Sequence, residues 1–117
     1  MIAPGAAAPP ALGALRDRVQ LRRRDAVSDE AGGHVITFVP IATVWARVRA
    51  LSPRSIQTAD GRAAQVTYAV VLRYRDDIKA GDRLVFQGRA LDVIGADDLN
   101  EQRIYLSCQC SETSFTG

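Results

Sequence analysis

Few residues in this sequence could carry acid–base, nucleophilic or metal chemistry. His34 is the single histidine among 117 residues, and it follows two glycines in a polar stretch. A serine or cysteine nucleophile needs a histidine positioned beside it by the fold. A loop position after glycines does not suggest such a placement, so we predict neither a catalytic nor a metal-binding role for His34.

The carboxylates include two neighbouring pairs, Asp76-Asp77 and Asp97-Asp98. Paired carboxylates could exchange protons with a substrate or bind calcium. Both pairs lie among turn-forming residues, where an Asp side chain usually accepts hydrogen bonds from nearby backbone N–H groups. The glycines near them lack the spacing and the following helix of a phosphate-binding loop. The sequence therefore predicts no enzyme, no metal and no cofactor.

Cys108 and Cys110 are two residues apart, a spacing that places both on one face of a strand. Neighbours at this spacing rarely form a disulfide, and two thiolates with one distant histidine cannot complete a zinc site. We expect two small buried thiols.

The arginines form the most prominent set of functional side chains. One group lies near the first predicted strand, and a second lies on outward faces of later strands: Arg16, Arg18, Arg22, Arg23 and Arg24, then Arg47, Arg49, Arg73 and Arg75. Such side chains could contact phosphates. Only Trp45 accompanies the outward arginines, whereas single-strand binders interleave aromatic rings with basic groups. Solvated faces or contacts between subunits account for them equally well.

The net charge of +2 hides an asymmetry along the chain. Residues 1–75 hold 11 arginines and 5 acids, a balance of +6, and residues 76–117 hold 4 basic residues and 8 acids, a balance of −4. A basic and an acidic pole would suit copies that pack side by side, or docking on a charged partner. A mixed, solvated surface remains the alternative.

The elements that position these residues are short strands. Residues 18–24 alternate as a half-buried strand, and Asp25–Gly33 is predicted to be a polar loop. Pro40 interrupts residues 34–51, which predicts an edge segment followed by a strand. Turn-forming residues then predict a long loop over Ser52–Gln65.

Later strands show clearer patterns. Val66 to Tyr74 places an apolar residue at every second position. Leu84 and Phe86 lead into a tight turn at Gln87-Gly88, which is the strongest hairpin signal. In the last strand, residues 103–110, we predict one apolar face made by four side chains, which are Ile104, Leu106, Cys108 and Cys110.

Roughly six strands with almost no helical periodicity predict an all-β fold, a small antiparallel β-barrel with a long inter-strand loop. We expect residues 1–11, rich in Ala, Pro and Gly, to form a flexible arm and residues 12–117 a single domain. No apolar run approaches the length of a membrane span, and the start lacks a basic region of a secretory signal. We therefore expect folding in the cytoplasm.

The order of several blocks resembles the head–tail joining proteins of tailed bacteriophages and gene transfer agents, also called head-closure or stopper proteins. The blocks are "LRDRVQLRRR", "ATVWARVRALSPRS" and "VTYAVVLRYRDDIKAGDRLVFQGRALDVIG", followed by a last strand. The resemblance covers about Leu12 to Cys110. It implies a non-enzymatic barrel at the head–tail interface of a virion or virus-like particle, assembled in the bacterial cytoplasm.

The resemblance also implies partners. Copies would form a homo-oligomeric ring of six or twelve, with a portal or adaptor protein above and a tail terminator or tail tube protein below. The ring would retain packaged double-stranded DNA without reading its sequence. In related rings a long loop enters the channel, and the matching stretch here is Ser52–Gln65. We therefore expect three residues of this loop to face the channel, which are Arg54, Gln57 and Arg62.

Five residues are expected to dock on partners, which are Arg22, Arg24, Asp29, Glu30 and Trp45. The loop Asp25–Gly33 and the N-terminal arm would become ordered on contact with an adjoining ring.

Other functions stay open at this stage. A stand-alone nucleic-acid-binding barrel would bind short DNA as a monomer, with a steep dependence on salt. A tail-completion protein would share the same architecture. The neighbouring adaptor layer is mostly helical in such particles, and this sequence is not.

Overall fold

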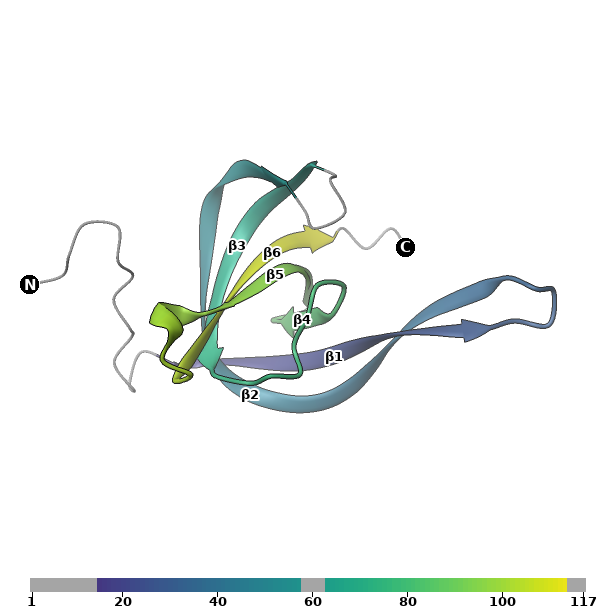
Figure 1. The fold of residues 1–117 in the computed structure, drawn as a ribbon, viewed down its shortest axis with the longest axis horizontal. Helices are drawn as coiled ribbons and strands as arrows, with labels where there is room; N and C mark the ends of the chain where they lie inside the picture. Colours follow the sequence, from purple (N-terminus) through teal and green to yellow (C-terminus); the bar gives the residue numbers. More distant parts are fainter. Residues whose placement is uncertain (1–14, 58–62, 114–117) are drawn as a thin grey trace, which may run out of the picture.

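Six antiparallel strands build the molecule (Figure 1), for which this computed structural model describes residues 15–57 and 63–113. The elements are β1 (Asp17–Ser28), β2 (His34–Gln57), β3 (Ala63–Arg73), β4 (Arg83–Phe86), β5 (Arg89–Asp98), a 3₁₀ turn η2 (Leu99–Glu101) and β6 (Tyr105–Thr113). Hydrogen bonding follows the order β1-β2-β3-β6-β5-β4 and closes through three residue pairs between β4 and β1. The predicted small antiparallel barrel is confirmed.

The core fills the barrel with side chains that alternate along each strand. Buried members come from all six strands, for example Leu21 in β1, Leu72 in β3 and Leu84 in β4. Ile78, in the segment between β3 and β4, is also buried against this core. Each such side chain contributes about 1.5–3 kcal/mol by leaving water. The alternation predicted for β2 and β3 is confirmed, since Ala46 and Val70 are buried while Trp45 and Arg47 are exposed.

The hairpin between β4 and β5 turns at Gln87 and Gly88, as the sequence predicts. Both residues have positive φ, 50° and 76°, which defines the turn that matches the twist of a two-residue β-hairpin. This hairpin supplies β4, and β4 closes the barrel onto β1.

The segment Asp25–Gly33 is not the predicted polar loop. β1 continues to Ser28 and β2 begins at His34, so the two strands form a long hairpin that extends well beyond the barrel (Figure 1). Pro40 does not break β2, because it lies beside a bulge between Leu21 and Arg22 of β1. That part of β2 has no strand on its other side among the described residues, so the missing N–H of proline is not needed there.

The predicted long loop Ser52–Gln65 is also largely strand. β2 runs to Gln57 and β3 begins at Ala63, and residues 54–57 pair with residues 63–66. A shift of register between Ala50 and Arg54 takes up Ser52 and Pro53, the turn formers that suggested a loop. Residues 58–62 lie outside the described part of the chain.

Two further predictions concern the last strand and the two ends of the chain. Ile104 does not join the buried face of the last strand, because it precedes β6 and is 48% exposed. Leu106, Cys108 and Cys110 are buried as predicted, and both cysteines are free.

The predicted arm over residues 1–11 lies outside the described residues. Within the described residues, no helix has the length and hydropathy needed to cross a bilayer.

Candidate interaction surfaces

The first surface is the β1–β2 arm, which we define as residues 23–39. Its two strands pair with each other from Arg23↔Val39 to Ser28↔His34, while β4 pairs with β1 only up to Arg22. Because no third strand covers the arm, its apolar side chains stay in water. Four of the six most exposed large hydrophobic residues of the described chain lie on it: Val27, Val35, Ile36 and Val39, at 48, 50, 41 and 45%.

Exposed apolar groups in such numbers mark a contact surface. Directly opposed residues of an antiparallel pair share a face. One face of the arm therefore carries Val27, Val35 and Val39, and the other carries Ile36 and Phe38. Both faces of the arm can thus contact another molecule.

A buried carboxylate fixes the base of the arm. Asp82 is 0% exposed, and its Oδ1 accepts a hydrogen bond from the backbone N–H of Arg24 at 3.2 Å. Its Oδ2 accepts one from the N–H of Lys79 at 3.1 Å. Asp82 therefore ties the turn before β4 to the point where the arm leaves the barrel. The sequence pattern does not single out Asp82, because an Asp directly after Gly81 is typical of an ordinary turn.

Cation–π stacking supports the same region. The Arg83 guanidinium lies 3.8 Å from the centre of the Phe38 ring, and its Nε donates a hydrogen bond to Asp92 Oδ1 at 2.7 Å. These contacts link the arm to β4 and β5, so the base of the arm has a defined direction relative to the barrel.

The tip of the arm is an acidic turn. Asp29 Oδ1 accepts hydrogen bonds from the N–H groups of Ala31 (3.0 Å) and Gly33 (2.7 Å) and so shapes the turn itself. Glu30 is exposed. No lysine or arginine occurs from Asp25 to Ala46, whereas three carboxylates do. The sequence predicts a basic first part and an acidic last part of the chain. Within the basic first part, however, the arm tip is acidic.

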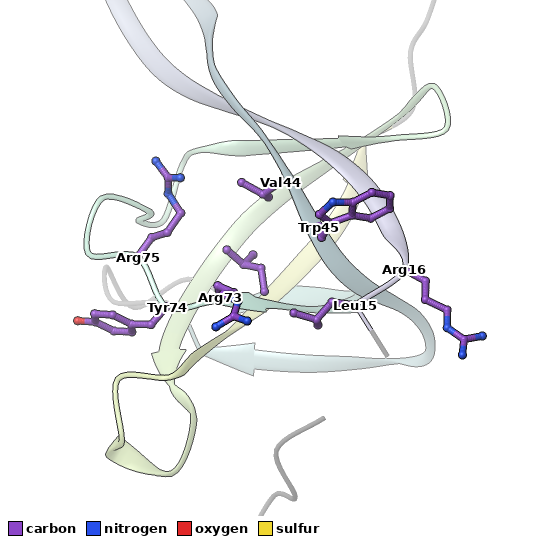
Figure 2. A pocket seen from close by; sticks show the side chains of 8 residues that line it. Leu15, Arg16, Val44, Trp45, Arg73, Tyr74 and Arg75 are labelled. Carbon is purple, nitrogen blue, oxygen red and sulfur yellow. The ribbon is translucent and has the colours of Figure 1, made fainter. Parts of the chain in front are cut away.

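The second surface is a hollow of about 740 Å³ where β3 ends and β1 begins (Figure 2). Its floor and walls are mostly apolar and its edge is basic; the lining residues are Leu15, Arg16, Val44, Trp45, Leu72, Arg73, Tyr74 and Arg75. Figure 2 shows Tyr74 and Arg75 on one side of the hollow and Trp45 and Arg16 on the other.

Two of the lining side chains have defined partners. The Arg18 guanidinium lies 4.7 Å from the centre of the Trp45 ring, and Trp45 remains 52% exposed. Arg75 binds Asp77 through two hydrogen bonds, of 2.9 and 2.8 Å. The bonds from Arg75, aided by the charges of Arg75 and Arg23, hold the pKa of Asp77 below its ordinary value against a smaller opposing effect of burial. Arg73 is exposed and has no acidic partner among the described residues.

The third surface is the β2–β3 extension, which we define as residues 54–57 and 63–66. Like the arm, these strand ends pair only with each other in the described chain. The two extensions leave the barrel in different directions, and β2 runs through both of them (Figure 1).

The predicted channel residues belong to the β2–β3 extension in part. The backbone of Arg54 pairs with Val66 and that of Gln57 pairs with Ala63. Arg62 lies outside the described residues.

The predicted docking residues do not form one patch. Asp29 and Glu30 lie at the arm tip, Trp45 lies at the hollow, and Arg22 and Arg24 lie near the base of the arm. Arg22 is half-buried, and its Nε donates to Gln20 Oε1 at 2.6 Å. The hollow itself was not predicted, because its residues come from distant parts of the sequence.

The groups with possible chemistry are dispersed. His34 begins β2 on the arm, Asp77 is paired with Arg75, and Asp98 accepts a hydrogen bond from the backbone N–H of Arg103 at 2.8 Å. In the described ranges, no three His, Cys, Asp or Glu side chains are grouped as a metal site would require. Burial raises the pKa of Cys108 to about 12, with Asp97 adding to the effect, and burial likewise raises the pKa of Cys110.

The geometry thus defines a closed β-barrel that presents contact surfaces on extended hairpins. Two solved structures share this fold. A protein from Shigella flexneri 2a, determined in solution, is 27% identical, with a TM-score of 0.66 over 90% of this chain and 98% of that one. A chain in the virion of a native gene transfer agent particle is 23% identical, with a TM-score of 0.64 over 85% and 96%. Comparison with curated proteins finds no match.

A family comparison identifies the chain more closely. Residues 11–113 match the phage head completion protein family, and the chain belongs to this family. Its members are structural components of phage-type particles, so the resemblance seen in the sequence and the prediction against an enzyme are both confirmed.

Proposed function

We propose that the protein is a head–tail connector, which forms a ring beneath the portal or adaptor of a filled particle, retains the packaged DNA and receives the tail. Membership of the phage head completion family is the observation that carries this proposal. The chain found in a gene transfer agent virion shares its fold, which supports a place in such a particle. The adaptor lies above this ring and the tail terminator or tail tube below it.

The architecture suits this role. A closed barrel leaves few free strand edges, so its copies meet through defined faces and do not pair at random. The two hairpin extensions leave the barrel in different directions, so one can contact neighbouring proteins while the other enters the channel (Figure 1).

In this proposal the β2–β3 extension faces the channel. Arg54 and Gln57 belong to this hairpin, and Arg62, the third expected channel residue, lies outside the described residues. Arginines there would contact DNA phosphates without reading sequence, which suits retention of any packaged genome.

A stand-alone DNA-binding barrel is less consistent with the surface. Trp45 is the one exposed aromatic ring among the described residues, and Arg18 already stacks on it. Repeated stacking rings, which single-strand binders use, are therefore lacking in this part of the chain.

The test uses particles produced with and without the protein. Without it, filled heads should lose DNA, measured as nuclease-sensitive genome, and should carry no tails. A chain lacking Ile56–Ala64 should restore tails but leave the DNA leaking. Arg103→Glu, at an exposed site away from both extensions, is the matched control and should restore both. Particles that keep DNA and tails in the absence of the protein would refute the connector function.

A further inference from the structure

We propose that the β1–β2 arm of one copy docks in the basic hollow of the next copy, and that this contact builds the ring. The inference deepens the proposed function, on which it rests, by naming the surfaces through which copies meet. It starts from two exposed apolar surfaces of the same chain. Five of the six most exposed large hydrophobic residues in the described chain lie on the arm or at the hollow.

An arm cannot fill the hollow of its own chain. Val35 on the arm and Trp45 at the hollow are ten residues apart on the continuous strand β2. At about 3.3 Å per residue, an extended strand holds them roughly 30 Å apart. If the arm enters this hollow, the hollow must therefore belong to another molecule.

The charges of the two surfaces are complementary. The arm carries Asp25 along its length and Asp29 and Glu30 at its tip, and no lysine or arginine occurs from Asp25 to Ala46. The hollow is edged by Arg16, Arg73 and Arg75, and no acidic residue lines it among the described residues. An acidic tip with apolar flanks thus matches an apolar hollow with a basic edge, and opposite charges set both the orientation and the choice of partner.

The contact is of the kind that generates rings. The arm and the hollow are different surfaces, so each copy would offer one to the neighbour on one side and the other to the neighbour on the opposite side. Such a head-to-tail contact closes into a ring when its rotation closes. A second copy is therefore the occupant that the charges and the strand geometry favour.

The first experiment reverses charges in the purified full chain and follows self-association by sedimentation velocity at low salt. Glu30→Arg and Arg73→Glu should each weaken self-association by at least about tenfold, because like charges then meet. The double variant should recover most of the loss. Glu101→Arg and Arg49→Glu are matched controls, since both sites are exposed and lie outside the arm and the hollow, and they should change little.

The second experiment traps the contact between two differently tagged chains. Val35→Cys on the arm and Val44→Cys in the hollow are mixed and oxidised, while the buried Cys108 and Cys110 stay unreactive. Mixed dimers should exceed the statistical proportion several-fold, and homodimers should not. Mixed dimers at or below that proportion would overturn the proposal.

The outcomes distinguish a failure of the proposed arm–hollow interface from a failure of the proposed connector function. Oligomers that are unaffected by the charge reversals would refute the arm–hollow contact but leave the ring intact. Absence of both oligomers and mixed dimers would also refute the contact, while particle assembly still tests the connector. A hollow covered by the chain's own first residues would protect the Val44→Cys thiol from alkylation until residues 1–11 are removed, and this result too would overturn the proposal.

Discussion

Asp82 connects the turn before β4 to the base of the β1–β2 arm. Its buried carboxylate accepts hydrogen bonds from the backbone N–H groups of Arg24 and Lys79. Removing the carboxylate breaks both bonds, and an amide donor left unsatisfied costs about 1–3 kcal/mol.

We therefore predict that Asp82→Ala lowers the free energy of unfolding by about 2–4 kcal/mol, measured by urea denaturation. Asp97→Ala is the control, because the Asp97 carboxylate is exposed and receives one bond, from Gln109 Nε2 at 3.2 Å. Its effect should stay within about 0.5 kcal/mol. Equal effects of the two variants would contradict a structural role for Asp82.

The two cysteines lead to a second prediction. Burial, aided by the charge of Asp97, raises the pKa of Cys108 to about 12, and burial also raises the pKa of Cys110. The thiolate is the reactive form, so neither thiol should react with iodoacetamide at mildly alkaline pH while the chain is folded. Both should react fully in urea. Rapid labelling of the native chain, followed by mass spectrometry, would show that β6 is not buried as described.

The ion pair of Asp77 with Arg75 predicts that the stability of the fold depends on pH in the acid range. Hydrogen bonds from Arg75, and the charges of Arg75 and Arg23, lower the pKa of Asp77 from 3.8. A carboxyl whose pKa is lowered by folding stabilises the native chain above its unfolded pKa and loses that effect as the pH falls through the folded value. Asp77→Asn should therefore be slightly less stable than the parent at neutral pH. The difference should vanish well below pH 3.8, as measured by urea midpoints.

At the scale of elements, the β4–β5 turn offers a direct test of backbone conformation. Gly88 has a φ of 76°, and a Cβ placed there would meet no atom within 4 Å. Substitution therefore changes backbone strain without creating a clash. Gly88→Val should cost about 1–2 kcal/mol in urea denaturation, because an L-residue in the left-handed region is strained. Gln87→Asn is the matched variant and should be neutral or slightly stabilising, since Asn suits that position. Equal stability of the two variants would contradict the turn.

The elements predictable from sequence are those with one buried face. Val66 to Leu72 alternates in hydropathy because its inward side chains fill the barrel. The residue types Gln87-Gly88 are typical of the tight turn that they form. The arm has no buried face, so Asp25, Ala26 and Val27 follow no period of two, and the segment reads as a polar loop. Its strand structure comes from pairing with residues 34–39, which composition does not reveal.

The candidate surfaces were predictable only in part, for a related reason. Trp45 and Glu30 could be recognised as exposed from their neighbours in sequence. The hollow assembles Leu15, Val44 and Tyr74 from three separated segments, and only the closed order of strands brings them together. Surface residues that only barrel closure brings together can therefore be identified from the structure but not from the sequence.

At the scale of the whole molecule, β2 connects the different parts. Its 24 residues begin in the β1–β2 arm, cross the barrel and end in the β2–β3 extension. Its middle is held between β1 and β3, whereas each end has a single partner strand among the described residues. An isolated two-stranded hairpin is only marginally stable in water, so the barrel should be rigid and both extensions should open easily.

Hydrogen exchange of the full chain tests this division. Backbone amides in the barrel, such as those of Val70 and Leu106, should exchange only on global unfolding, because their strands have neighbours on both sides. Paired amides of the arm, in residues 23–28 and 34–39, should exchange many-fold faster in the dissociated chain. In the assembled ring these arm amides should become protected while barrel amides change little, since a docked arm gains a partner for its exposed faces. Arm amides that exchange at one rate before and after assembly would show that the barrel wall, and not the arm, carries the contact between copies.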